Sequence, residues 1–175
     1  MLTFELGLGI LALTLAWLFD LQPWLELRPD IKALLLGLLT LFPMLLGFYW
    51  MTVSQAAWVT ELKAFVERLI VPVFSRIGPF GIFLVSLGAG VFEELLFRGV
   101  IQAGLTSPLG LWGALIVASL LFGLAHAMTV TYFVITFFMG IYLGLAYHWS
   151  GSLLVPMLAH FLYDWLVLHY YLRKR

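Results

Sequence analysis

The sequence predicts an all-α integral membrane protein with about six transmembrane helices and one interfacial amphipathic helix. Of its 175 residues, 63% are hydrophobic and only 10% are charged, and the mean hydropathy is +1.07. A soluble domain needs a polar surface that this composition does not supply. The apolar runs are continuous rather than alternating, which argues against a transmembrane β-barrel. We expect a single membrane domain over residues 1–175, because no linker divides it.

Composition also narrows the function. The formal net charge is zero, so nothing indicates nucleic-acid binding. The absence of Cys excludes disulfides, thiol nucleophiles and thiolate metal sites.

Two apolar runs in the first third of the chain are long enough to span a bilayer, which takes about 20 residues. They are Leu2–Leu21 and Ile31–Val53. Between them, Pro23 and Pro29 stand among charged and amide side chains, which predicts a connection outside the membrane.

Residues 54–77 are amphipathic rather than uniformly apolar. Large apolar side chains recur there at helical spacing and most charged side chains fall elsewhere; the apolar positions are Trp58, Leu62, Phe65 and Leu69. We place this helix in the membrane interface. A cap packed over the bundle is the alternative, and the sequence does not separate the two.

The rest of the chain contains further apolar runs of spanning length. Ser107-Pro108 and Ser150-Gly151 are turn signals between them. The predicted spans are Pro79–Leu105, Leu109–Met128, Thr131–Trp149 and Ser152–Leu172.

An even number of spans puts both termini on one side of the membrane. Only Arg28 and Lys32 fall on the opposite side, whereas the side of the termini holds Lys63, Arg68, Arg76, Arg173, Lys174 and Arg175. By the positive-inside rule, we expect both termini in the cytoplasm.

A few charged residues fall inside the predicted spans, namely Glu93, Glu94, Arg98 and Asp164. Each raises the free energy of membrane insertion by at least about 2.5–3.5 kcal/mol. Glu94 and Arg98 stand four residues apart and can pair along one helix face. The residues alone leave open whether that pair is a buried structural contact or takes a direct part in catalysis. Glu93 points about 100° away from Glu94, so it is free for another partner.

Two histidines accompany these charges. His126 lies near the end of the fourth apolar run, and His160 stands four residues before Asp164 on the last one. Each histidine taken alone can be interpreted as a satisfied core residue. Their occurrence together with Glu93 on three different runs favours one shared site.

A site of Glu, His and Asp without Cys restricts the chemistry. Ser152, which follows a glycine, is a weak nucleophile candidate, and the zinc motif with two His and a Glu on one helix turn is absent. A carboxylate and a His that polarise a water fit the composition, with further donors for an oxyanion. A metal held by two His and one Glu fits as well.

Three patterns in the second half of the chain form a known combination. Residues 93–98 read EELLFR, residues 122–126 read FGLAH, and His160 precedes Asp164 by four positions. They resemble the EExxxR, FxxxH and HxxxN/D motifs of the CAAX-protease and bacteriocin-processing family, which contains intramembrane proteases related to type II CAAX prenyl endopeptidases. We expect residues 79–165 to form the catalytic core.

The resemblance implies a role for each motif residue. Glu93 would be the general base that activates water, helped by His126. Glu94 and Arg98 would pair and shape the site.

The third motif, His160 with Asp164, would orient or stabilise the tetrahedral oxyanion. Asp164 stands where the best-studied members have Asn. Members of the family are described both as metalloproteases and as metal-free glutamate proteases. We favour a site without a cofactor; the zinc alternative would use Glu93, His126 and His160.

We therefore expect an intramembrane endopeptidase that cuts a membrane-associated protein or peptide, with its C-terminal segment as one possible target. We place it as a multi-pass protein of the bacterial plasma membrane, in contact with lipid and not with nucleic acid. One alternative is a non-catalytic immunity or scaffold protein that keeps the polar cluster for structure. A transporter with a proton relay through Glu93 and His126 is weaker, because no internal repeat is visible.

Overall fold

The computed structural model describes residues 2–174, and within that range the chain forms helices and no strand. The elements are α1 (Leu2–Leu18), a 3₁₀ turn η1 (Pro23–Glu26), α2 (Ile31–Val53), α3 (Ala57–Phe65), a π-helical turn η2 (Val66–Ile70), α4 (Val71–Phe74), α5 (Pro79–Gly88), two π-helical segments η3 (Ala89–Glu93) and η4 (Leu95–Gln102), α6 (Ala103–Ala125), α7 (Val130–Ser150) and α8 (Leu154–Arg173). The predicted all-α membrane architecture is confirmed.

Within residues 2–174, three helical stretches are by length and composition apolar enough to cross a bilayer, namely Ile31–Val53, Pro79–Ala125 and Val130–Ser150. The second has 47 residues, and it reverses direction at Gly110, whose φ of 67° and ψ of 170° are not helical. Glycine adopts a positive φ without the steric cost that a Cβ brings. The stretch therefore contains two passes through the bundle, as the Ser-Pro signal at residues 107–108 predicts.

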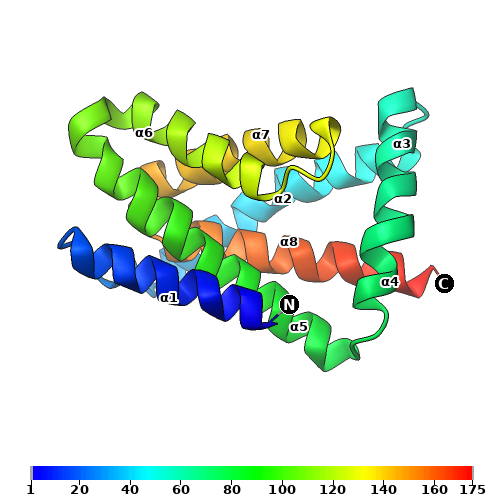
Figure 1. Ribbon diagram of the computed structural model, residues 1–175, viewed down its shortest axis with the longest axis horizontal. Helices are drawn as coiled ribbons and strands as arrows, with labels where there is room; N and C mark the ends of the chain where they lie inside the picture. Colours follow the sequence, from blue (N-terminus) through cyan, green and yellow to red (C-terminus); the bar gives the residue numbers. More distant parts are fainter. Residues whose placement is uncertain (1, 175) are drawn as a thin grey trace.

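The long helices run side by side along the long axis of the molecule, and the segment from α3 to α4 stands across one end of them (Figure 1). That segment corresponds to the predicted amphipathic helix. Its fully buried residue is Val59, whereas Trp58 is 43% exposed. Trp58 packs its ring against Trp50 at the end of α2, and Leu62 and Phe65 of the predicted apolar stripe are half-buried.

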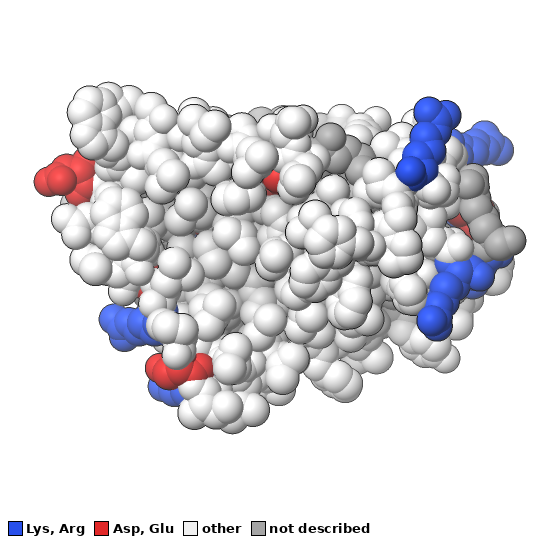
Figure 2. Space-filling view, turned by 90° about the horizontal axis from the view of Figure 1, so that it is seen from below, with Lys and Arg blue, Asp and Glu red and all other residues white. Residues whose placement is uncertain are grey.

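Lys and Arg gather at the two ends of the molecule, and the broad band between them is nearly free of charge (Figure 2). Within the bundle, α8 packs against α2, α5, η3 and α7. Large apolar side chains cover the outside of the helices, which is the pattern of a protein that is solvated by lipid.

Small residues let the helices of the bundle approach closely. A Cβ built on Gly90 of η3 would lie 2.7 Å from the backbone nitrogen of Phe161 on α8, so only glycine fits there. On α7, Gly140 faces the backbone of Ser119 on α6, and Gly144 lies one turn later against Gln102. This spacing of small residues is typical of close helix packing in membranes.

Helix α1 packs along η3 and η4 through one narrow face. The buried residues of that face are Glu5, Gly9, Ala12 and Ala16. The alanines belong to an apolar cluster with Leu96, Phe97 and Val100 of η4, among others.

Helix α2 is interrupted and anchored near its middle. Pro43 lies inside the helix, where it provides no N–H for the Leu39 carbonyl. Just before it, the Tyr142 hydroxyl of α7 donates to the Thr40 carbonyl at 2.9 Å. Residues of α2 before Pro43 are thus bonded directly to α7.

Candidate active site

Glu94 and Arg98 form a buried pair, as their spacing predicts. Arg98 Nη1 donates to Glu94 Oε1 at 2.9 Å, and Arg98 Nη2 donates to the Gly140 carbonyl of α7 at 3.0 Å. The two side chains are 1% and 0% exposed. A guanidinium matches this arrangement because its planar fork offers two donors in fixed directions.

His160 joins this pair from another helix. Its Nδ1 lies 2.7 Å from Glu94 Oε1, although the two residues are 66 positions apart in the sequence. The contact is possible because the glycine at position 90 lets η3 approach α8 closely. On the other side of the ring, His160 Nε2 lies 3.5 Å from Asp164 Oδ2, which keeps the predicted third motif together.

Glu93 faces a different partner from Glu94, as expected from their angular separation. Its Oε2 lies 3.6 Å from His126 Nε2, and this buried oxygen accepts no hydrogen bond from residues 2–174. His126 Nδ1 lies 2.9 Å from the Phe122 carbonyl. Because a carbonyl only accepts, Nδ1 carries the proton, and a neutral His126 presents its Nε2 lone pair to Glu93.

Phe122 forms the wall between the two halves of the site. The Arg98 guanidinium carbon lies 4.6 Å from the centre of its ring, a cation–π geometry. The rings of His126 and His160 lie 4.6 and 5.9 Å from it, centre to centre. The aromatic residue of the second motif therefore contacts side chains of all three motifs.

The site opens into a cavity of about 650 Å³. Glu93, His126, His160 and Asp164 line it, whereas Glu94 and Arg98 lie behind its wall. Residues of α3, η2 and α4 close one side of the cavity. All six predicted site residues therefore lie together, with four of them reaching the cavity.

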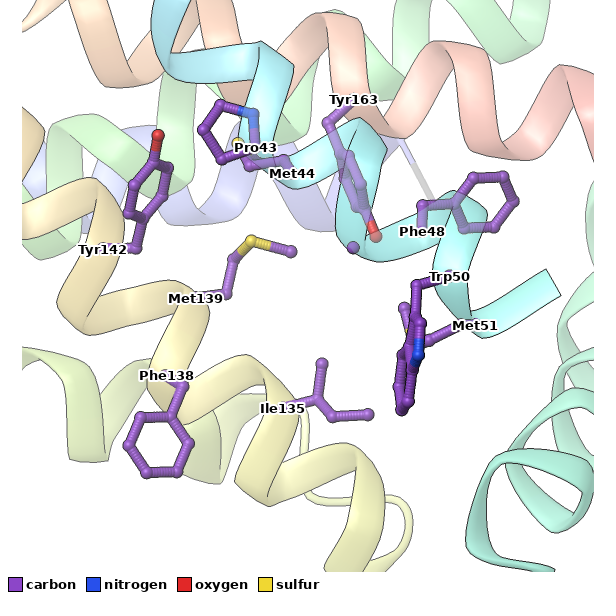
Figure 3. Close-up of a pocket in the computed structure, with 11 residues that line it drawn as sticks. Pro43, Met44, Phe48, Trp50, Met51, Ile135, Phe138, Met139, Tyr142 and Tyr163 are labelled. Atoms are coloured by element: carbon purple, nitrogen blue, oxygen red, sulfur yellow. The ribbon is translucent and has the colours of Figure 1, made fainter. Parts of the chain in front are cut away.

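An apolar cleft of about 340 Å³ between α2 and α7 adjoins this cavity. Figure 3 shows Pro43, Met44, Trp50 and Met51 of α2 opposite side chains of α7, with Tyr163 of α8 at the back. Several of these side chains line the cavity as well, namely Met44, Phe48, Met51, Ile135, Met139 and Tyr163. The cleft and the cavity are thus neighbours that share these side chains as part of their lining.

The residues of the zinc alternative do not fit a metal as they are placed. Both ring nitrogens of His160 face carboxylates other than Glu93, namely Glu94 and Asp164. Over residues 2–174, no three His, Asp or Glu side chains converge as a metal-binding group. We therefore derive no step through a metal.

The sequence prediction missed Glu5, and it offered Ser152 as a weak nucleophile candidate although this residue lies away from the cavity. Glu5 of α1 is buried and lines the same cavity as Glu93; the signal was its spacing with Gly9, Ala12 and Ala16, which marks one buried helix face. Ser152, the weak nucleophile candidate, donates to the Arg28 carbonyl at the α7–α8 turn and does not line the cavity.

Residues 75–166 match the family described as Rce1-like, type II CAAX prenyl endopeptidase. The chain belongs to this family. The matched segment contains all three motifs, and the description of the family is that of a prenyl endopeptidase.

Two curated relatives are similar to this family member. Membrane-embedded CAAX protease MroQ of Staphylococcus aureus is 34% identical over 133 residues, which is 67% of this chain and 53% of the relative. YpbD of Bacillus subtilis, described as uncharacterized, is 37% identical over 95 residues, 53% of this chain and 46% of the relative. The chain thus spans about half the length of the curated relatives it matches. No solved structure matches it significantly.

Proposed function

We propose that the chain is an intramembrane endopeptidase of the glutamate type, which hydrolyses a peptide bond with a water activated between Glu93 and His126. The observation that carries this proposal is the separation of the two carboxylates. Glu94 is bonded to Arg98 and His160, whereas Glu93 Oε2 is unbonded among residues 2–174 and lies 3.6 Å from a histidine lone pair.

The pair presents two acceptors to a water. A separation of 3.6 Å is too long for a direct hydrogen bond, and a water that donates one proton to each side chain satisfies both. Glu93 takes a proton as the water oxygen attacks the substrate carbonyl, and it returns that proton to the nitrogen of the leaving amine. The C–N bond then breaks to give a carboxylic acid and an amine.

His160 is positioned to stabilise the oxyanion of the tetrahedral intermediate. Glu94 holds its Nδ1, and Nε2 faces the cavity beside Asp164. In the protonated ring, Nε2–H is the donor toward the tetrahedral oxygen. Asp164 keeps that ring oriented, and Arg98 fixes Glu94 beneath it, so we propose both as positioning residues.

The substrate we propose is a membrane-associated protein or peptide that reaches the cavity through the α2–α7 cleft. The cleft is lined by apolar side chains, so it suits an apolar segment of a substrate, including one at its C-terminus. For orientation, the positive-inside rule supports cytoplasmic termini, and relatives from two bacteria support a bacterial plasma membrane.

The first prediction concerns Glu93. We expect Glu93→Gln to abolish cleavage, because the amide cannot accept the proton of the water, while helix content and detergent-solution behaviour stay unchanged. The measurement uses purified, chelator-treated wild type and variant against a pool of membrane-anchored and C-terminal peptides, with products identified by mass spectrometry.

The outcomes separate the alternatives. Cleavage retained by Glu93→Gln contradicts the mechanism. Loss of wild-type activity on chelation, restored by zinc, favours the metal-dependent version. A protein whose cellular function survives both Glu93→Gln and His126→Ala is the non-catalytic scaffold, for which the hydrogen bonds from Arg98 to Glu94 and to the Gly140 carbonyl are the supporting observation.

A further inference from the structure

Glu5 is a buried carboxylate that the proposed peptidase chemistry does not use. It is 7% exposed, and its Oε2 has no hydrogen-bond partner in the described part of the chain. The other buried residues of α1 are Gly9, Ala12 and Ala16, which pack without polar groups. An unpaired carboxylate at membrane depth is costly, so helix packing alone does not account for Glu5.

The neighbouring helix fixes where this carboxylate points. A Cβ built on Gly88 of α5 would lie 3.1 Å from Glu5 Cβ and 3.2 Å from Glu5 Cγ. The side chain therefore lies flat against α5 and reaches the catalytic cavity, which it lines together with Glu93 and Asp164.

The basic groups around the cavity are already engaged. Arg98 is bonded to Glu94, behind the cavity wall. His160 lies between Glu94 and Asp164. The Lys63 ammonium, which also lines the cavity, donates to two backbone carbonyls at the end of α2, at 2.9 and 3.4 Å. Carboxylates therefore outnumber the cations that are free to neutralise them.

We propose that Glu5 and Asp164 form an acidic subsite that binds a basic side chain, Lys or Arg, of the substrate. The proposal rests on the peptidase function above and defines its substrate class more narrowly. Membrane proteins carry Lys and Arg just beyond the cytoplasmic ends of their spans. A substrate whose apolar segment occupies the α2–α7 cleft brings such a residue to the cavity end near the start of α1. In this low-dielectric setting, opposite charges attract strongly.

The test measures binding rather than cleavage, so it does not depend on turnover. Full-length Glu93→Gln protein is immobilised in detergent and exposed to a pool of capped ten-residue apolar peptides, which occur in sets that differ only by Lys, Arg, Gln or Glu at one position. Bound peptides are quantified by mass spectrometry. We expect Lys and Arg members to be enriched about tenfold over their Gln counterparts, and Glu members to be depleted.

Variants assign the effect to Glu5. Adding Glu5→Gln removes the enrichment, and adding Glu5→Asp retains most of it, which also guards against a merely misfolded Gln variant. The matched control is Glu61→Gln, because Glu61 is an exposed acidic residue of α3 and leaves the enrichment unchanged.

Equal recovery of Lys and Gln peptides, or recovery of neither, overturns the subsite. An enrichment that survives Glu5→Gln overturns it as well. Failure of the peptidase function is a separate result, because it is read from cleavage by the wild type.

Discussion

At the scale of single residues, Arg98 connects the site to the scaffold. One nitrogen bonds Glu94 and the other bonds the Gly140 carbonyl, so the same side chain positions a site carboxylate and joins η4 to α7. Glu94 in turn holds His160. Removing one partner of such a buried pair leaves an uncompensated charge.

We therefore predict that Arg98→Lys is strongly destabilising although the charge is kept. One ammonium does not reproduce the two directed bonds of the guanidinium, so a buried acceptor loses its donor, and we expect a loss of about 1–3 kcal/mol in the free energy of unfolding. Denaturant unfolding in detergent micelles measures it. Arg76→Lys is the matched control, because Arg76 is exposed; equal stability of both variants contradicts the prediction.

The sequence predicted site contacts within one helix and missed contacts between helices. Spacing of four residues placed Glu94 with Arg98 and His160 with Asp164, because both pairs lie along one helical face. The bond from His160 to Glu94 depends on how two helices cross, which no local pattern encodes. Glu5 shares a helix face with the small residues Gly9 and Ala12, which was a local signal, but the packing of that face against Gly88 depends on how the helices are arranged.

At the scale of elements, the helix that carries the first motif is wider than an α-helix. Residues 89–93 and 95–102 wind as π-helix, a form that is rare and is found frequently at functional sites. The ends of the helices were predicted within a few residues from apolar runs and Pro or Gly signals. The π winding was not, because hydrophobicity patterns assume an ordinary helical period.

We predict that Gly90→Ala separates this helix from α8. The new Cβ would meet the Phe161 backbone at 2.7 Å, so the helices must move apart and the His160–Glu94 bond lengthens. We expect a cost of about 1–3 kcal/mol and a loss of peptidase activity, measured by unfolding and by cleavage. Gly78→Ala is the control because its Cβ meets nothing within 4 Å.

A second prediction at this scale tests the α2–α7 cleft. Gly47 lines the cleft but not the catalytic cavity, and a Cβ there meets nothing within 4 Å. Gly47→Trp should fill the cleft without disturbing the fold and lower kcat/KM by at least about tenfold. Gly7→Trp on α1 is a matched control, since Gly7 is exposed and equally open. Unchanged cleavage by Gly47→Trp would show that substrates use another route.

At the scale of the whole molecule, the uncharged band predicts how the protein lies in a membrane. Charges gather at both ends (Figure 2), and α3 to α4 lies across the end where the last helix finishes (Figure 1). We propose that this end faces the cytoplasm, because it holds most of the basic residues.

Single cysteines test the orientation, since the natural chain has none. We expect Lys32→Cys to react with a membrane-impermeant maleimide on intact cells, and Lys174→Cys to react only after permeabilisation. Both positions are exposed. The reverse pattern would invert the topology and place the catalytic cavity toward the outside.

The proline in α2 also separates two parts of that helix that have different partners. Before Pro43 in the sequence, the Tyr142 hydroxyl bonds α2 to α7. From Pro43 onward, α2 forms one wall of the cleft. The proline also removes the hydrogen bond that the Leu39 carbonyl would otherwise accept.

Residues 44–53 beyond this proline are not free of the motif helices, because Phe48 packs against Tyr163 and Tyr170 of α8. A bulky guest that pushes this half of α2 outward therefore also pulls on the helix that carries His160 and Asp164.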